Sequence, residues 1–206
     1  MKYIKKWFVL IISGIMLVAL AGCSLDIKSA LSPETSFTPS ADSSTISGLP
    51  KIEGEEISLP CKIKDLEAQR FETDYLYEDG YVKMWHIAEE NRGNNLCMYL
   101  CLDKEYKDKD YVSNEDTVVA IKVVQYDHID FDFKGIRLWT SKDDVLEIAG
   151  TPAYSKEFPF KGEYYFYLGD NGQIYRFKFL ATDKVEEILF GTEEYMTDEK
   201  GQLYTE

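Results

Sequence analysis

The residues that could perform acid–base or metal chemistry are few. The chain contains two histidines, His86 and His128, and His128 lies close to Asp127, Asp130 and Asp132. Carboxylate oxygens suit Ca²⁺ or Mg²⁺. However, this stretch lacks the central glycine of a calcium loop, and strand alternation would direct Asp127 away from the other two acids. We therefore expect a solvated loop without a bound metal.

Common catalytic motifs are missing from the sequence. It contains no G-x-S-x-G, no H-E-x-x-H and no P-loop. His86 shares its parity with Val82 and Met84, which indicates a histidine packed in or beside a sheet. The mixed-charge run 103–110 is typical of a surface turn. We expect no enzyme activity, no catalytic residue and no cofactor.

The cysteines beyond Cys23 suggest buried thiols. Cys23 stands apart from Cys61, Cys97 and Cys101. In a strand, Cys97 and Cys101 would lie about 13 Å apart, whereas a disulfide needs about 4.4–6.8 Å between Cα atoms. These two should therefore not pair with each other. A disulfide from Cys61 to either one stays open, and thiols serving as small apolar side chains are the default interpretation.

Composition narrows the class of partner. The chain has 206 residues, with 37 acids against 23 Lys and Arg and a net charge of −14. Such a charge argues against nucleic-acid binding, which needs basic residues to neutralise phosphates. The 15 Tyr and 11 Phe favour strands. The length suits one sizeable domain.

The N-terminus has the order of a secretory signal. Three lysines and no acid occur in residues 1–22, and residues 8–20 are mainly apolar. This run is shorter than the roughly 20 residues that span a bilayer. The quartet Leu-Ala-Gly-Cys at 20–23 resembles the lipobox of bacterial lipoproteins. The resemblance implies cleavage before Cys23, a diacylglyceryl group on its sulfur, and a lipid-anchored protein on the extracytoplasmic face of a bacterial membrane. An ordinary signal peptide is the alternative.

Residues 23–49 are expected to form a tether after the lipidated cysteine. Eight Ser, three Thr and two Pro occupy half of positions 24–49. Such a composition buries too little apolar area to offset its ordering entropy. We therefore place the start of the folded domain at Pro50.

The second half of the domain contains a well-marked helix. Ser141 can cap its start with Asp144 at the third helical position, and Gly150 and Pro152 can end it. Its expected apolar face consists of Val145, Ile148 and Ala149.

Strand patterns follow each of two helical patterns. In the second half they cover 163–168, 173–180 and 184–190, with a hairpin turn at 169–172. In the first half a short helix at 63–69 precedes strands at 81–87, 95–102 and 117–126. Residues 118–121 are apolar on both parities, which predicts a central strand.

A family resemblance rests on these motifs. The strings G-I-R-L at 135–138 and G-T-P at 150–152, the helix between them and the aromatic hairpin at 163–180 resemble β-lactamase-inhibitor-protein-like domains. Leu-Pro at 59–60 resembles the partner repeat in uncharacterised lipoproteins of low-GC Gram-positive bacteria. The resemblance implies an α+β domain over 50–206. It would have two tandem repeats, about 50–133 and 134–192, and an acidic tail at 193–206. Each repeat would be a short helix followed by three to four antiparallel strands in one continuous sheet.

The aromatic residues supply the functional hypothesis. One face of an antiparallel sheet can stay open, and aromatics on it would bind a partner. Because Phe166 and Leu168 suit a core, we predict that Tyr165 and Tyr167 face outward, with Trp85 as a further binding residue. The expected function is a non-catalytic interaction module that binds a protein or peptide. An envelope structural or assembly lipoprotein and a solute- or metal-binding lipoprotein are the alternatives.

Overall fold

The computed structural model describes residues 39–78, 81–86, 97–103, 112–124, 129–158 and 162–197. They belong to the second of two compact units, Met1–Ser36 and Phe37–Glu206. The predicted signal peptide and Cys23 therefore lie outside the described residues. None of the described helices has the length and apolar character needed to cross a bilayer.

Most of this unit is one ten-stranded sheet. Its principal strands are β5 (Phe71–Glu78), β6 (Tyr81–His86), β7 (Cys97–Leu102), β8 (Thr117–Val124), β10 (Tyr154–Phe158), β11 (Gly162–Gly169), β12 (Gln173–Phe179) and β13 (Val185–Thr192). The two remaining strands of this sheet are short, β1 (Thr45–Ile46) and β4 (Cys61–Lys62). The order is β1-β11-β12-β13-β8-β7-β6-β5, with β10 paired to β11 and β4 paired to β8. The pairing of β13 with β8 places Phe190 opposite Ile121. Strands from both halves of the chain therefore share one sheet.

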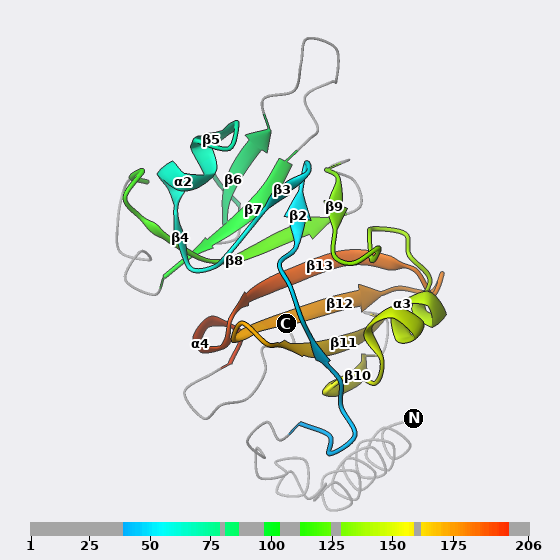
Figure 1. Ribbon diagram of the computed structural model, residues 1–206. Coiled ribbons are helices and arrows are strands. Elements are labelled where there is room, and N and C mark those ends of the chain that lie inside the picture. The colour runs from blue at the N-terminus through cyan, green and yellow to red at the C-terminus, as the bar shows by residue number, and fades with distance from the viewer. Residues whose placement is uncertain are drawn as a thin grey trace, which may run out of the picture. The chain divides into compact units, whose positions relative to one another are not determined.

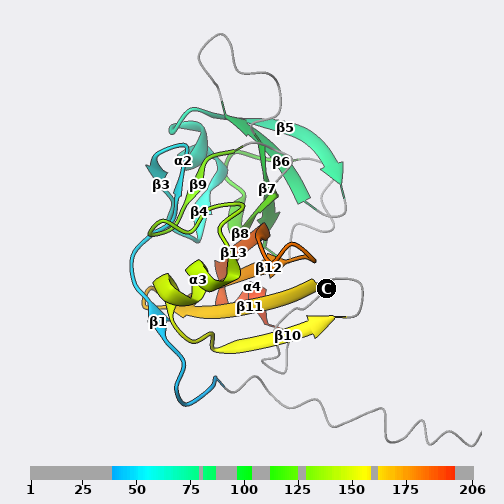
Figure 2. The ribbon, with the colours of Figure 1, turned by 90° about the vertical axis from the view of Figure 1, so that its right-hand side faces the viewer.

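One face of this sheet is covered by several short elements. They are β2 (Lys51–Ile52), β3 (Glu55–Glu56) and β9 (Phe131–Asp132), which form a three-stranded sheet, together with α2 (Ile63–Glu67) and α3 (Lys142–Ala149). Figures 1 and 2 show all five on the same side of the ten-stranded sheet. Among the described helices, only α4 (Glu193–Met196) contributes to the second, smaller apolar cluster, through the buried Met196. The other buried members of that cluster lie on strands.

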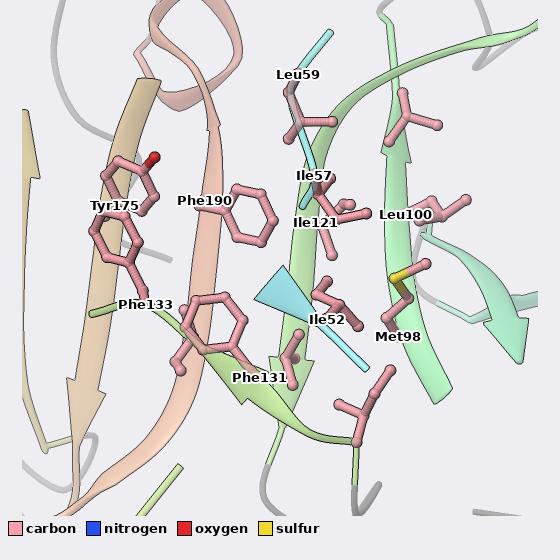
Figure 3. Packing of buried hydrophobic residues seen from close by; sticks show 14 of the residues in the cluster. Ile52, Ile57, Leu59, Met98, Leu100, Ile121, Phe131, Phe133, Tyr175 and Phe190 are labelled. Atoms are coloured by element: carbon pink, nitrogen blue, oxygen red, sulfur yellow. The ribbon is translucent and has the colours of Figure 1, made fainter. Parts of the chain in front are cut away.

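The main core lies beneath these covering elements. Figure 3 shows Tyr175, Phe190, Ile121 and Leu100, which come from four adjacent strands, in one continuous apolar layer. Ile52 of the small sheet belongs to the same cluster and is fully buried. The core is therefore unbroken where β13 meets β8.

The predicted α+β class with two helix-plus-sheet repeats is wrong. The protein is mostly β, with a large mixed sheet, a small second sheet and only short described helices. The helices α2, α3 and α4 have five, eight and four residues. The stretch 45–62, for which no strand was predicted, forms β1 to β4. Two-residue strands carry no periodicity of their own, so the repeat pattern could not include them. β1, β2 and β4 also pair with strands that are distant in the sequence.

The predicted tether is also wrong over its last residues. β1 (Thr45–Ile46) pairs in parallel with β11, and Ile46 is buried. The amides of Ser40 and Ser44 donate to the carbonyls of Ala153 and Thr151, at 3.0 and 2.9 Å. The ordered domain therefore begins about ten residues before Pro50. Its Ser-rich composition concealed this because the pairing uses backbone groups.

The local signals of the second half predicted its elements well. α3 covers Lys142–Ala149, and Ser141 Oγ accepts a hydrogen bond from the Asp144 amide at 3.1 Å. The hairpin of β11 and β12 and the central position of β8 are likewise confirmed. Ile148 is an exception, because 42% of its surface is exposed while Val145 and Ala149 are buried.

Candidate functional site

The predicted outward positions of Tyr165 and Tyr167 are wrong. Tyr165 is 8% exposed and Tyr167 is fully buried. The Tyr167 hydroxyl donates to the Gly150 carbonyl at the end of α3, at 3.1 Å. Burial raises the pKa of the Tyr167 phenol. These tyrosines face the main core under α3 and cannot form an open binding surface.

The alternate residues of β11 are buried as well, on the opposite face. Tyr164 and Phe166 belong to a second apolar cluster with Leu189 and with Met196 of α4. The start of α4 is fixed by Thr192, whose hydroxyl accepts from the Tyr195 amide at 3.4 Å. The side chains on both faces of β11 are therefore buried in a core. For this reason, the presence of Phe and Leu on one face and Tyr on the other could not predict which face is exposed.

A buried ion pair lies next to this second cluster. Arg176, which is 4% exposed, donates to Glu187 at 2.6 Å, and Lys178 lies 3.7 Å from the same carboxylate. The Arg176 guanidinium also lies 5.1 Å from the Tyr164 ring centroid. Because Glu187 pairs with two cations, its negative charge is already neutralised within the fold.

Farther along the same face, β6, β7 and β8 carry a cluster of a different kind. We name it the aromatic–lysine cluster, and it consists of Tyr81, Lys83, Trp85, Tyr99 and Lys122. Strand alternation explains its position, because Val82, Met84, Met98 and Leu100 point into the core and leave the alternate residues on this face. All five members are half-buried.

Each lysine of the cluster lies over two rings. Lys83 Nζ is 4.5 Å from the Trp85 centroid and 5.6 Å from that of Tyr99. Lys122 Nζ is 3.7 Å from the Tyr81 centroid and 5.0 Å from that of Tyr99. Tyr81 and Tyr99 also pack edge to face at 6.4 Å. The arrangement is a preformed surface of rings and ammonium groups, which can contact both apolar and anionic groups.

The ammonium groups of this cluster have no carboxylate partner in the described part of the chain. There, neither Lys83 nor Lys122 forms an ion pair within 4.0 Å. The nearest acids by register are on β5, where Asp74 lies opposite Lys83 and Glu72 opposite Trp85. Lys122 lies between Tyr99 and Leu189, which are both uncharged.

Trp85 is the one predicted binding residue that lies in this cluster. Its role in binding stays a prediction. Sequence reasoning missed the other four members, although the run Y-V-K-M-W at 81–85 alternates core residues with rings and a lysine. That alternation was the available signal.

None of the three described cysteines, Cys61, Cys97 and Cys101, is in a disulfide, and Cys97 and Cys101 are buried. Burial raises the pKa of both the Cys61 and the Cys101 thiol to about 12. Cys101 is also hydrogen-bonded with the Tyr195 hydroxyl, whose pKa burial raises. Cys61 and Cys101 are therefore protonated at neutral pH and are poor nucleophiles.

The predicted acidic stretch is only partly visible. Asp127 and His128 lie outside the described residues, as do residues 104–110 of the mixed-charge run. Arg137 binds Asp132 at 2.7 Å and lies 3.7 Å from Asp130. Within the described ranges, no group of three His, Cys, Asp or Glu could hold a metal ion. The two visible acids thus serve an ion pair that closes the turn after β9.

A cavity of about 390 Å³ lies beside α4. Its lining comprises Pro60, Asp103, Thr117, Val119, Thr192, Glu194 and Tyr195. Lys62 Nζ donates to Thr117 Oγ1 at 2.8 Å. The lining residues carry two carboxylates and three hydroxyls, which suit a small polar solute.

Comparison with known proteins adds little. No family model and no curated protein matches the chain. Among solved structures, it is similar to a cysteine-rich secretory protein from Staphylococcus aureus subsp. aureus Mu50, with 16% sequence identity and a TM-score of 0.42. The match covers 78% of this chain and 55% of that one, so the chain spans about half the length of that protein. A likeness this weak carries no argument about function.

Proposed function

We propose that the chain is a lipid-anchored extracytoplasmic protein whose folded unit is a non-catalytic interaction module. In this proposal it binds a protein or peptide at the aromatic–lysine cluster. The observation that carries the binding part is the half-buried state of three rings, Tyr81, Trp85 and Tyr99, on a sheet face. Trp and Tyr dominate the energetics of protein interfaces because they bury a large area at low entropic cost.

The contrast within the sheet supports this choice of site. The rings of β11 are buried in one or the other core cluster. The rings of the aromatic–lysine cluster retain accessible surface, and two lysines lie over them. Of the three rings, that of Tyr81 also packs against the second apolar cluster. Covering them with a partner would bury additional apolar area, at roughly 25 cal/mol per Å².

Site-specific photo-crosslinking in cells tests the binding site. A photoreactive phenylalanine analogue would replace Trp85 in the full chain, and a control chain would carry it in place of Trp139, which is 51% exposed. We expect one defined adduct from position 85 that is lost when Tyr99→Ser is added. Equal adducts from both positions, or none from position 85, would contradict the proposal.

The anchor has its own test. Supporting it are the basic and apolar N-terminal order and the quartet at 20–23. Cells expressing the chain would be fed a palmitate analogue, and Cys23→Ala should abolish labelling because the thioether needs the thiol. Equal label on the variant would remove the lipoprotein assignment.

A solute-binding lipoprotein is the second candidate, and the cavity beside α4 is the observation that favours it. Its volume of about 390 Å³ lies within the range of small-molecule sites. The test is a nuclear magnetic resonance (NMR) screen of the full chain with small amines and sugars. A solute that binds the unchanged chain but not Val119→Phe, which fills the cavity, would support this candidate. Binding that survives Val119→Phe would exclude it.

A further inference from the structure

We propose that the partner of the aromatic–lysine cluster is an acidic polypeptide segment that places two carboxylates on Lys83 and Lys122. This inference rests on the proposed function and adds the chemistry of the partner. Its basis is the pair of ring-bound ammonium groups and their spacing.

The spacing follows from the strand register. Lys83 lies opposite Tyr99, and Tyr99 lies opposite Lys122. Two strand separations of about 4.8 Å put the two lysine Cα atoms about 10 Å apart. The Tyr99 ring lies between them, within 5.6 Å of Lys83 Nζ and 5.0 Å of Lys122 Nζ. A segment lying across the strands would thus contact one ring between two cations.

The state of the two lysines favours carboxylates. A ring contacts an ammonium group from one side, so the other N–H donors remain for a partner. Because the cluster is half-buried, a carboxylate there is less screened by water than at an exposed lysine. Charge-assisted hydrogen bonds of this kind are roughly twice as strong as neutral ones.

The charge distribution supports the same choice. The chain has a net charge of −14, yet this face gathers Lys83, Lys122, Arg176 and Lys178. Glu187 is shared by the last two. The acids of β5 lie at the edge, in register with Lys83 and Trp85 but not with Lys122. A basic segment would therefore be repelled by the lysines of this cluster.

A lipid surface fits less well than a polypeptide. Insertion into headgroups uses large, exposed apolar side chains. Among the described residues, those are Trp139 and Ile148, and neither belongs to the cluster. The cluster rings are half-buried, and Tyr81 packs edge to face on Tyr99, which suits contact with another protein surface.

Fluorine NMR on the full lipidated chain, held in phosphatidylcholine nanodiscs and labelled with 5-fluorotryptophan, tests the inference. Trp85 reports on the cluster and Trp139 is an internal control. Three blocked peptides of equal length would repeat Glu-Tyr-Ser, Gln-Tyr-Ser or Lys-Tyr-Ser. In a polyproline II conformation, which has three residues per turn, their variable residues recur on one side of the peptide about every 9 Å. We expect the glutamate peptide to shift the Trp85 resonance and leave Trp139 in place, with affinity falling as salt rises.

Matched variants locate the effect. Lys83→Gln and Lys122→Gln should each weaken the glutamate peptide by about tenfold, as expected for the loss of a charge-assisted hydrogen bond. Lys51→Gln is the control, because Lys51 is exposed and paired with Glu56 at 3.6 Å. It removes the same charge and should change nothing.

The outcomes separate this inference from the proposed function. Equal affinity of all three peptides, with Trp85 shifted by each, would overturn the acidic partner and leave peptide binding at the cluster intact. No shift of Trp85 with any peptide would contradict both. A Trp85 shift that appears without peptide when phosphatidylglycerol replaces phosphatidylcholine would assign the face to the membrane and overturn the inference.

Discussion

The aromatic residues of β11 and those of β6 follow the same alternating pattern but end in different surroundings. On β11, Tyr167 packs under α3 while Phe166 packs in the cluster that includes α4. On β6, Met84 enters the core, while Trp85 stays half-buried beneath a lysine. An alternating pattern therefore fixes two faces of a strand but not what covers each face.

The covering elements explain this difference. α3 is held over β11 by Lys142, whose ammonium group binds Glu163 and Asp183 at 3.1 and 3.0 Å. These carboxylates raise the pKa of Lys142. In the aromatic–lysine cluster, the ammonium groups of Lys83 and Lys122 lie over the rings. The rings of the first region are thus closed off by packing, whereas the rings of the second keep part of their surface accessible.

The largest expected effect concerns the buried region. Tyr167→Ala should lower the free energy of unfolding by about 3–5 kcal/mol, because it removes a fully buried ring. Tyr167→Phe should lose only about 1 kcal/mol, for the hydrogen bond to the Gly150 carbonyl. Denaturant unfolding measures both. A loss below about 0.5 kcal/mol for the alanine variant would mean that Tyr167 is on the surface.

A smaller effect is expected at the contact between Gly150, at the end of α3, and Ser44. Gly150 has a φ of 77°, and an added Cβ would collide with Ser44. Gly172 has a φ of 76° with open space around it. Gly172→Ala should lower the unfolding free energy by about 1–2 kcal/mol for the backbone alone. Gly150→Ala should lose at least about 1 kcal/mol more. Equal losses would show that the 40–46 segment does not pack against α3.

The third prediction concerns the pH dependence of stability and rests on Cys101, a member of the second apolar cluster. Burial raises the pKa of Cys101 to about 12. The folded state therefore keeps a proton that the unfolded state releases above its ordinary pKa, so stability should fall as pH rises from about 9 towards 12. Cys101→Ala should reduce this slope by up to about 1.4 kcal/mol per pH unit. An unchanged slope, measured by denaturant unfolding, would place the thiol in water.

The smallest effect is the coupling within the aromatic–lysine cluster. A double-mutant cycle with Lys122→Gln and Tyr81→Leu should give a coupling energy of about 0.5–1 kcal/mol, as for other cation–π pairs. Coupling above about 2 kcal/mol would instead describe a buried structural pair and weaken the binding proposal.

Local chemistry made part of this fold predictable. Ser141 and Gly150 marked both ends of α3, and the 169–172 turn located the β11–β12 hairpin. Residues 118–121 were apolar on both parities and proved to lie in a central strand. Each of these signals is contained within a short stretch of chain.

The rest depended on contacts between distant segments. β1 and β4 are two-residue strands that exist only through pairing with β11 and β8. The burial of Tyr165 and the exposure of Ile148 depend on which element covers them. The aromatic–lysine cluster joins residues of three strands. It could be recognised only from the strand register, which places Lys83, Tyr99 and Lys122 side by side.

Hydroxyl-radical footprinting of the full chain, with and without the glutamate peptide, tests the central claim most directly. It compares the oxidation rates of the two aromatic sets in one experiment. Tyr81, Trp85 and Tyr99 should be oxidised faster than Tyr165 and Tyr167, and only the first three should be protected when the peptide is added. Equal rates in the two sets, or protection confined to Tyr165 and Tyr167, would contradict the assignment of one region to stability and the other to binding.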